Sequence, residues 1–406
     1  MDELAIVEQI EKSLDQGIGQ GIFPGGAVLL QRDRMSEIAV YRGKTGIGEQ
    51  EPLVTEQTLY DLASLTKVVV TLPLILLSVQ KGKLSLTDSV VTHLPQLGEG
   101  HEGSEKEKIK IIHLLTHTSG LPAWRPFFVK GSGKREYLHM IAEEQMIYKP
   151  GEQVVYSDLG FMLLGFILEE VWQTELSELA KQWIFEPSGM KYTGYLPLEQ
   201  PALRELAIAP TEEGNPFERN MAEQYIWQLE AVEDPRAAEW RRTLEHFAWR
   251  QEVIRGHVHD CNAYHGLEGV SGHAGLFSTL TDVARYMRIW TDKDAPVRID
   301  PLLLSFAVRA QTGAVAPRRA VGWEASTTGG TLEQVAHGCT GGDLLSEQAF
   351  GHTGFTGTSI WSDPVRGATL ITLTNRVHPI VHTSMNTWRR THHNQIFSGI
   401  KPVGTS

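Results

Sequence analysis

Ser64 and Lys67 stand three residues apart, in the run Ser64-Leu65-Thr66-Lys67, at the start of a long apolar segment. On a helix, side chains at this spacing lie on the same side. A serine hydroxyl is a weak nucleophile, and a neighbouring amine can take its proton or hold the group that does. The backbone N–H groups and dipole of a helix N-terminus add positive potential where an oxyanion would form. The pair therefore predicts nucleophilic chemistry at Ser64.

The same Ser-x-x-Lys spacing also occurs at Ser78/Lys81, Ser188/Lys191 and Ser398/Lys401. For any one such pair, a surface or capping serine is the ordinary interpretation. The surroundings distinguish the first pair. Only Ser64 follows a strand-like segment, Tyr60-Asp61-Leu62, and a small Ala63, and precedes a long apolar helix. We therefore expect Ser64 to be the nucleophile.

A second motif, Tyr156-Ser157-Asp158, follows the turn Pro150-Gly151 and precedes an apolar helix expected over 159–171. A tyrosine in a loop that enters a helix can present its hydroxyl to a cleft, although a packed aromatic is the commoner role. Asp158 can also cap the helix N-terminus. The sequence leaves both interpretations of this motif open.

The third motif is His352-Thr353-Gly354-Phe355-Thr356-Gly357, on a strand near the C-terminus. A glycine at 354 lets a ligand backbone approach the strand closely, and an exposed strand edge can pair with an extended substrate. A glycine-rich hairpin without a binding role is the alternative interpretation.

Taken together and in this order, the three motifs resemble those of the serine β-lactamase and penicillin-binding superfamily. The resemblance is to its class C-like branch, which includes D-alanyl-D-alanine carboxypeptidases and family VIII carboxylesterases. It extends from about residue 20 to 385, and the charged stretch 219–249 is its least familiar part. Three further segments are similar to stretches common in that branch: His113-Leu114-Leu115-Thr116-His117-Thr118-Ser119-Gly120-Leu121-Pro122, Gly272-His273-Ala274-Gly275-Leu276-Phe277-Ser278-Thr279 and Thr374-Asn375-Arg376-Val377-His378-Pro379.

The resemblance implies a role for each motif residue. Ser64 is the acylated nucleophile, Lys67 and Tyr156 share the proton transfers, and the backbone N–H groups of Ser64 and Phe355 form the oxyanion hole. The substrate-binding residues that it implies are Asp158, His352, Thr353, Gly354, Asn375 and Arg376. We expect no metal and no other cofactor.

Two positions depart from the pattern of many members of the superfamily. Residue 158 is Asp instead of Asn, and residue 352 is His instead of Lys. A carboxylate beside Lys67 favours the ammonium form, which shifts the role of base toward Tyr156. An imidazole, with a reference pKa of about 6.5, is mostly neutral at pH 7, so its help for an anionic substrate is partial unless Arg376 compensates.

We therefore expect a carboxylesterase acting on short-chain esters or small amides. The alternatives are a D-alanyl-D-alanine carboxypeptidase or penicillin-binding protein, a weak class C-like β-lactamase, and, from another class, an inactive homologue acting as a binding protein. The general base is left open between Lys67 and Tyr156.

The elements that must position these residues predict an α+β fold. An expected helix over 2–19 and strands over 27–31 and 38–41, joined by a turn at 32–36, precede a long helical stretch from about 65 to 254. A helix over 281–291, strands over 349–353, 358–361 and 368–374, and a last helix over 380–397 follow. We expect an antiparallel sheet flanked by the N- and C-terminal helices, as in a β-lactamase-like sandwich, with an inserted all-helical domain. The boundaries are 1–62 and 268–406 for the sheet domain and 63–267 for the helical domain, with the active site between them.

Composition excludes some partners. The 406 residues include 37 Lys and Arg against 49 Asp and Glu, a net charge of -12 that repels nucleic acid. The longest apolar stretch, 68–79, is too short to span a bilayer, and the N-terminus lacks the pattern of a signal peptide. With only Cys261 and Cys339 present, we expect reduced thiols. We predict a cytoplasmic protein acting on a small-molecule ester, amide or β-lactam, unless the chain is a trimmed form of an exported one. The sequence does not indicate an oligomeric state.

Other hydrolase classes fit less well. His257-Val258-His259-Asp260 offers possible metal ligands, but no His-Glu-x-x-His helix or cysteine-pair spacing accompanies it. No Gly-x-Ser-x-Gly nucleophile elbow occurs, and Gly43-Lys44-Thr45 lacks the upstream glycine of a P-loop.

Overall fold

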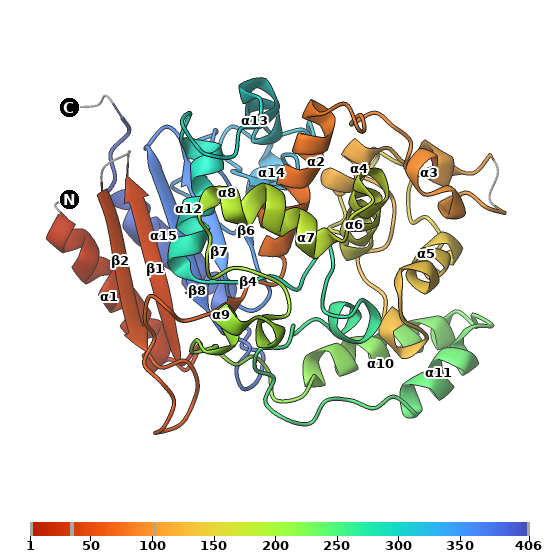
Figure 1. The fold of residues 1–406 in the computed structure, drawn as a ribbon, viewed down its shortest axis with the longest axis horizontal. Coiled ribbons are helices and arrows are strands. Elements are labelled where there is room, and N and C mark those ends of the chain that lie inside the picture. Colours follow the sequence, from red (N-terminus) through yellow and green to blue (C-terminus); the bar gives the residue numbers. More distant parts are fainter. Residues whose placement is uncertain (1–2, 33–35, 101–102, 404–406) are drawn as a thin grey trace.

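The computed structural model describes residues 3–32, 36–100 and 103–403, and its main feature is an antiparallel sheet. The sheet has six strands in the order β2-β1-β8-β7-β6-β5. Their bounds are β1 Gly25–Arg32, β2 Ser36–Gly43, β5 Glu324–Ala325, β6 Phe350–Thr353, β7 Ser359–Asp363 and β8 Ala368–Thr374. A separate pair is formed by β3 (Tyr60–Asp61) and β4 (Phe277–Ser278). The two chain ends lie close to the sheet (Figure 1).

The sheet separates two cores, because successive side chains of a strand point to opposite faces. In β1, Val28 and Leu30 pack with α1 (Glu3–Gly19) and α15 (Met385–Ser398). Ala27 and Leu29 belong to the core on the other face, where α12 (Leu280–Thr291) contacts β1 and β8. The sheet is therefore covered by helices from both ends of the chain on one face (Figure 1).

The remaining helices lie mostly between β3 and β4 in the chain. They are η1 Lys67–Thr71, α2 Leu72–Gln80, α3 Val90–His93, η2 Pro95–Leu97, η3 Glu105–Lys108, α4 Ile111–Leu115, η4 Phe127–Val129, α5 Lys134–Glu143, α6 Asp158–Trp172, α7 Leu176–Ala180, η5 Lys181–Phe185, α8 Glu186–Ser188, η6 Pro197–Glu199, α9 Pro201–Arg204, α10 Pro216–Ala231, α11 Ala237–Glu245 and η7 Asn262–Gly266, followed after β4 by α13 Pro301–Ala307 and α14 Leu332–His337.

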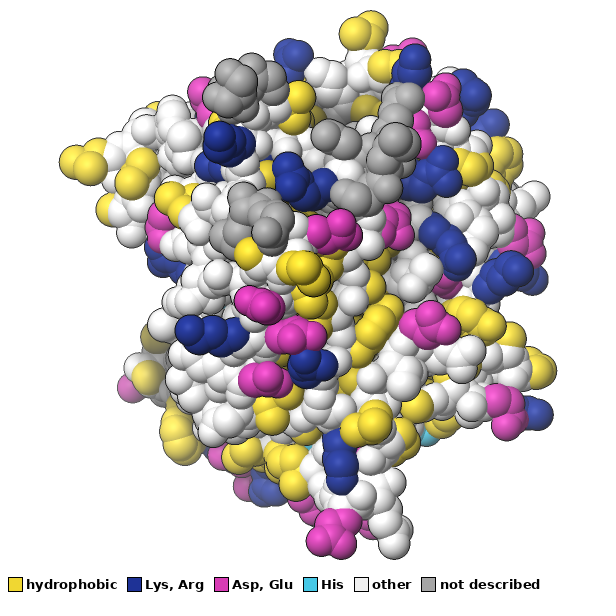
Figure 2. All heavy atoms as spheres, turned by 90° about the vertical axis from the view of Figure 1, so that its left-hand side faces the viewer, with side chains coloured by type: hydrophobic (Ala, Val, Ile, Leu, Met, Phe, Trp, Pro, Cys, Tyr) yellow, Lys and Arg dark blue, Asp and Glu magenta, His cyan; other side chains and the backbone are white. Residues whose placement is uncertain are grey.

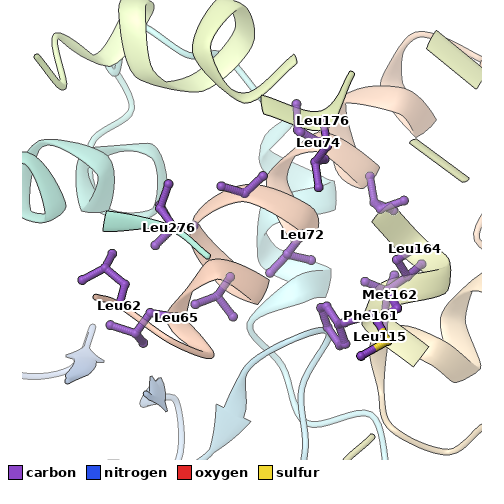
Figure 3. Close-up of a cluster of buried hydrophobic side chains, with 14 of the residues drawn as sticks. Leu62, Leu65, Leu72, Leu74, Leu115, Phe161, Met162, Leu164, Leu176 and Leu276 are labelled. Atoms are coloured by element: carbon purple, nitrogen blue, oxygen red, sulfur yellow. The ribbon is translucent and has the colours of Figure 1, made fainter. Parts of the chain in front are cut away.

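The helix that carries Lys67 runs through the larger core. All five residues of η1, a π-helical segment, are buried, and α2 is buried from Leu72 to Ser78. A helix that is apolar on every side is stable only inside a protein. Figure 3 shows Leu72 beside Phe161 of α6, and Leu62 and Leu65 together with Leu276 of the segment before β4. The start of the predicted catalytic helix is thus anchored on two sides.

The structure confirms the expected α+β class and corrects several details. The strand expected over 368–374 is β8. The charged stretch 219–249, expected to be helical, is not one helix. Residues 232–236 separate α10 from α11, because Glu233 has a φ of +54° and Pro235 lacks the N–H that a continuing helix needs. The strand-like segment Tyr60-Asp61-Leu62 contains β3, whereas the two-residue strands β4 and β5 were not predicted, because they are too short to show alternation. Residues 33–35 of the predicted turn lie outside the described residues, and the domain boundaries stay a prediction.

The surface charges, the two cysteines and the helix lengths can be compared with the sequence-based expectations. Figure 2 shows basic and acidic side chains interspersed on the end of the molecule formed by the sheet. Cys261 and Cys339 are both buried and unbridged. No helix within the described ranges has the length and apolar character to cross a membrane. The cytoplasmic location stays a prediction.

The packing of α6 generates a test of stability. A methyl group at Gly272 would meet the backbone carbonyl of Phe161 and lie 3.0 Å from the backbone nitrogen of Gly165. Backbone atoms of a buried helix cannot move aside cheaply, so Gly272→Ala should lower the free energy of unfolding by about 1–3 kcal/mol. Urea denaturation measures this loss. Gly19→Ala is the control, because nothing lies within 4 Å of a methyl group there, and an equal loss in both variants would contradict the packing argument.

Candidate active site

Ser64 lies on a tight turn that links β3 to the buried helix. Ala63, just before it, has a φ of +46°, which a residue with a side chain adopts only when its surroundings hold it there. The Asp61 carboxylate accepts the Ala63 N–H at 2.8 Å, and the Thr66 hydroxyl donates to the Ala63 carbonyl at 2.7 Å. These bonds fix the backbone on both sides of Ser64, so the hydroxyl is held at the wall of a cavity.

Lys67 is completely buried, and its ammonium group has two hydrogen-bond acceptors and one ion-pair partner. Nζ lies 2.9 Å from Ser64 Oγ, 3.0 Å from the His273 carbonyl oxygen and 2.7 Å from Asp158 Oδ1. Burial by itself disfavours the charge, but the Asp158 carboxylate and Tyr156 outweigh it and raise the pKa of Lys67 above its ordinary value. At neutral pH Lys67 is therefore an ammonium that donates to Ser64.

Asp158 has this role because another residue caps the helix. The Ser157 hydroxyl accepts the Gly160 N–H at 3.2 Å and donates to the Pro122 carbonyl at 2.7 Å. Asp158 is the first residue of α6, and its carboxylate turns to Lys67 instead. The interpretation of Asp158 as the helix cap is therefore wrong, because Ser157 occupies that position.

Tyr156 is surrounded by rings and cations. Its ring centroid lies 4.4 Å from that of His117 and 5.8 Å from that of His352, with Lys67 Nζ at 5.0 Å and Arg319 Cζ at 5.2 Å. Within the described residues its buried hydroxyl has no hydrogen-bond partner. A buried, unpartnered hydroxyl at the cavity wall is free to exchange a proton with a bound molecule.

The third motif forms β6 and the turn that follows it, and this turn is bonded to the chain just before Ser64. The Thr356 hydroxyl donates to the Asp61 carbonyl at 2.7 Å, and the Thr358 hydroxyl donates to the Leu62 carbonyl at 3.1 Å. A methyl group at Gly354 would collide with the Leu62 carbonyl and the Thr358 side chain. The chain itself therefore makes a close approach that requires this glycine, and the expected approach of a ligand backbone stays a prediction.

The same bonds bring the two predicted oxyanion donors to one cavity. Ser64, Thr353, Gly354 and Phe355 all line it. Among the residues that the structure describes, neither the Ser64 nor the Phe355 backbone N–H has an acceptor. Unpaired N–H groups at a cavity wall can stabilise negative charge that develops on a substrate oxygen.

His352 is buried and neutral. Its Nδ1 donates to the Thr353 carbonyl at 2.8 Å, which leaves Nε2 as an acceptor without a partner. Burial, then the nearby positive charges of Arg319 and Lys67, lower the pKa of His352 well below its ordinary value. The imidazole therefore lines the cavity as a neutral acceptor and does not supply the charge of a lysine.

The cavity has a volume of about 510 Å³ and a mixed lining. Its apolar residues include Trp124, Phe217, Met221, Val258 and Phe355. Its charged residues include Arg319, Arg376 and Arg389 together with Asp158, Glu218, Asp260 and Glu324. An opening of this size accepts a small molecule with an apolar part and a polar or charged part.

The two residues of the predicted Asn375-Arg376 pair lie in different places. Arg376 lines the cavity, where its Nε donates to the Phe355 carbonyl at 2.7 Å, and burial lowers its pKa to about 10. Asn375 is buried away from the cavity lining and donates to the Thr45 and Pro210 carbonyls, both at 2.8 Å. Its amide joins two loops, so its position does not fit the predicted contact with substrate.

Several residues at the site were not predicted. The His273 carbonyl holds Lys67, His117 stacks on Tyr156, and Arg319 and Arg389 enter the cavity from segments outside the three motifs. Phe217 and Met221 come from α10. The runs His113–Pro122 and Gly272–Thr279 are similar to stretches of the superfamily, which is a signal for His117 and His273. No local pattern indicates Arg319 or Arg389.

Two of the possible metal ligands in the run His257-Val258-His259-Asp260 interact with other side chains. His259 Nε2 lies 3.0 Å from Glu212 Oε2, and the Asp260 carboxylate lies 3.1 Å from His273 Nε2. The described residues contain no group of three or more His, Cys, Asp or Glu side chains that is placed to hold a metal ion.

Comparison with solved structures shows the fold. A hydrolase with promiscuous acyltransferase activity, EstCE1, superposes with a TM-score of 0.71 at 18% identity, over 97% of this chain and 99% of its own. A class C β-lactamase in complex with cefoxitin also gives 0.71 at 18% identity, over 98% of this chain and 100% of its own.

Comparison of sequences shows the family. A protein of Salmonella agona (strain SL483), named "Putative D-alanyl-D-alanine carboxypeptidase", is 30% identical over 369 residues, which are 87% of this chain and 76% of the relative. The family model described as Beta-lactamase matches residues 7–395. With the fold of class C β-lactamases and this match over nearly the whole chain, the protein belongs to the β-lactamase family of serine hydrolases.

Proposed function

We propose that this serine hydrolase acts through an acyl-enzyme on Ser64, with Tyr156 as the general base. The observation that carries the proposal is the contact of Lys67 Nζ with Ser64 Oγ at 2.9 Å. Although burial opposes the charge of Lys67, the Asp158 carboxylate and Tyr156 raise its pKa above the ordinary value, so the group that makes this contact is an ammonium. Because Lys67 donates, the Ser64 O–H is left to donate elsewhere. The unpartnered Tyr156 hydroxyl oxygen is the acceptor that we propose.

In the proposed first step, the Ser64 proton moves to the Tyr156 phenolate while Oγ bonds to the substrate carbonyl carbon. The N–H groups of Ser64 and Phe355 receive the resulting oxyanion. When the bond to the leaving group breaks, Tyr156 returns the proton to it. A water molecule then attacks the acyl carbon, gives its proton to Tyr156 and releases the acid, and that proton returns to Ser64 Oγ. Lys67 stays an ammonium throughout.

We propose short-chain esters or small amides as the preferred substrates. The apolar side chains of Trp124, Phe217 and Met221 suit a short acyl chain, and the neutral His352 offers no charge to a substrate carboxylate. One observation favours the carboxypeptidase alternative: Arg376 and Arg389 line the same cavity and can bind a carboxylate. The cytoplasmic location stays a prediction.

The nucleophile can be tested directly. Ser64→Ala should abolish covalent labelling by a fluorophosphonate and reduce ester turnover by about a thousandfold or more, because it removes the only atom that bonds to the acyl group in the proposed mechanism. Intact-mass analysis detects the label. Ser78→Ala is the matched control, since Ser78 belongs to another Ser-x-x-Lys pair and donates to the Leu74 carbonyl inside α2. A wild-type protein that neither labels nor turns over any ester would support the inactive homologue.

The ion pair predicts a pH effect. The pKa of Lys67 is raised, with burial opposing and Asp158 favouring the ammonium, so removing the carboxylate lets burial lower it. Asp158→Asn should therefore shift the basic limb of kcat/KM to lower pH, by about one pH unit or more. A pH series with p-nitrophenyl butyrate measures the shift. An unchanged basic limb would mean that the charge of Lys67 does not control the reaction.

Substrate preference can be tested with a panel at pH 7.5. We expect a higher kcat/KM for p-nitrophenyl acetate or butyrate than for a cephalosporin, because His352 is neutral. Arg389→Gln should leave the ester values within about threefold. Efficient cephalosporin or D-Ala-D-Ala cleavage that is lost in Arg389→Gln would instead favour the carboxypeptidase alternative.

A further inference from the structure

Arg319 brings an unpaired charge into the cavity. It lies on the segment between α13 and β5, where its N–H donates to Thr312 Oγ1 at 3.0 Å and its carbonyl accepts the Gln311 N–H at 2.7 Å. The backbone is therefore fixed. Within the described residues, the guanidinium makes no hydrogen bond or ion pair, and its Nε is buried. The guanidinium lies over the face of the Tyr156 ring, with Cζ 5.2 Å from the ring centroid.

A partly buried cation without a carboxylate partner costs stability, since it has lost hydration and gained nothing equivalent. Its neighbour shows what a structural arginine does here. Arg318 donates to the Ser326 carbonyl at 2.9 Å and pairs with Glu347 at 3.2 Å. Arg319 lacks such bonds, so its charge has no structural explanation within the described residues.

The other groups that face Tyr156 provide little net charge. Lys67 is charged, but Asp158 lies 2.7 Å from its Nζ and balances it. His117 accepts the Ser157 N–H at Nδ1, and burial lowers its pKa well below its ordinary value, so it is neutral. His352 is neutral for the same reason.

Asp260 is a further acidic group near Lys67, and it is paired with His273 at 3.1 Å. Among the described groups around Tyr156, only the positive charge of Arg319 therefore has no carboxylate within ion-pair distance. The two departures at residues 158 and 352 each remove positive potential from the site, and Arg319 lies where it restores some of it.

We propose that Arg319 is a positioning residue that keeps Tyr156 in its basic form, supplying from the segment before β5 the positive charge that residue 352 does not. The inference rests on the proposed function, in which Tyr156 is the general base. A cation at the face of the ring favours a phenolate over a phenol, because the charge it stabilises is spread over the ring and the oxygen. Arg319 acts through Tyr156 and bonds to no reacting atom.

The test is the pH dependence of kcat/KM for p-nitrophenyl butyrate, a neutral ester that offers no carboxylate to an arginine. Loss of the cation makes the base harder to deprotonate, so Arg319→Gln should move the acidic limb to higher pH by about one unit. Arg319→Lys, which keeps the charge, should stay close to wild type. Arg318→Gln is the matched control and should leave the limb in place, because Arg318 is bonded outside the cavity.

A second variant tests the relation between the two positions. His352→Lys in the Arg319→Gln background places a cation on β6, and it should move the acidic limb back toward lower pH. A structural loss at residue 319 would not be rescued in this way. If Arg319→Gln does not fold, Arg319→Met keeps the aliphatic packing and removes the charge, and the same shift is expected.

An acidic limb that stays in place in folded Arg319→Gln overturns the inference. So does a variant whose only defect is a raised KM for an ester with a free carboxylate, such as mono-p-nitrophenyl glutarate, because Arg319 would then bind substrate. Fluorophosphonate labelling of the wild-type protein separates the two levels. Labelling and turnover with an unmoved limb contradict only the role of Arg319, whereas absence of labelling and turnover contradicts the proposed function as well.

Discussion

The buried ammonium of Lys67 is the interaction on which the site depends. It joins three parts of the chain: the Ser64 turn, the first residue of α6 through Asp158, and the segment before β4 through the His273 carbonyl. A buried charge is tolerated only when all its donors are used and a counter-charge is near. Any arrangement that broke one of these contacts would leave an uncompensated ion in the core, so the charge selects one geometry for Ser64.

A second constraint ties the sheet to that geometry. Two threonine hydroxyls of the β6–β7 turn, from Thr356 and Thr358, bond to the carbonyls of Asp61 and Leu62, and Gly354 allows the approach. The Phe355 N–H is thereby placed on the same cavity as Ser64, although nearly three hundred residues separate them. Strain at Ala63 is sustained because these bonds hold the residues before the turn, and the Thr66 hydroxyl holds the Ala63 carbonyl from the other side.

The electrostatic character of the cavity differs from what its motifs alone suggest. The negative charge of Asp158 balances the positive charge of Lys67, and His352 is kept neutral by burial and by the cations beside it. The positive potential instead comes from arginines outside the three motifs. Of these, Arg376 donates to the Phe355 carbonyl, and Arg389 belongs to α15. A cavity lined by these arginines and by Phe217 and Met221 of α10 suits a substrate that is apolar in one part and polar in another.

The sequence by itself determined the local features: the helix around Lys67, the Tyr156 loop ahead of α6, the strand β8 and the α+β order, because hydrophobic period, turns and short motifs are properties of neighbouring residues. Pro235 was a visible signal for the break between α10 and α11. Only the tertiary structure decided that Ser157 caps α6 while Asp158 holds Lys67, that Asn375 joins two loops, and that Arg319 faces Tyr156. These outcomes depend on which distant segments pack together, since the direction and charge state of a side chain are set by neighbours that are remote in the sequence.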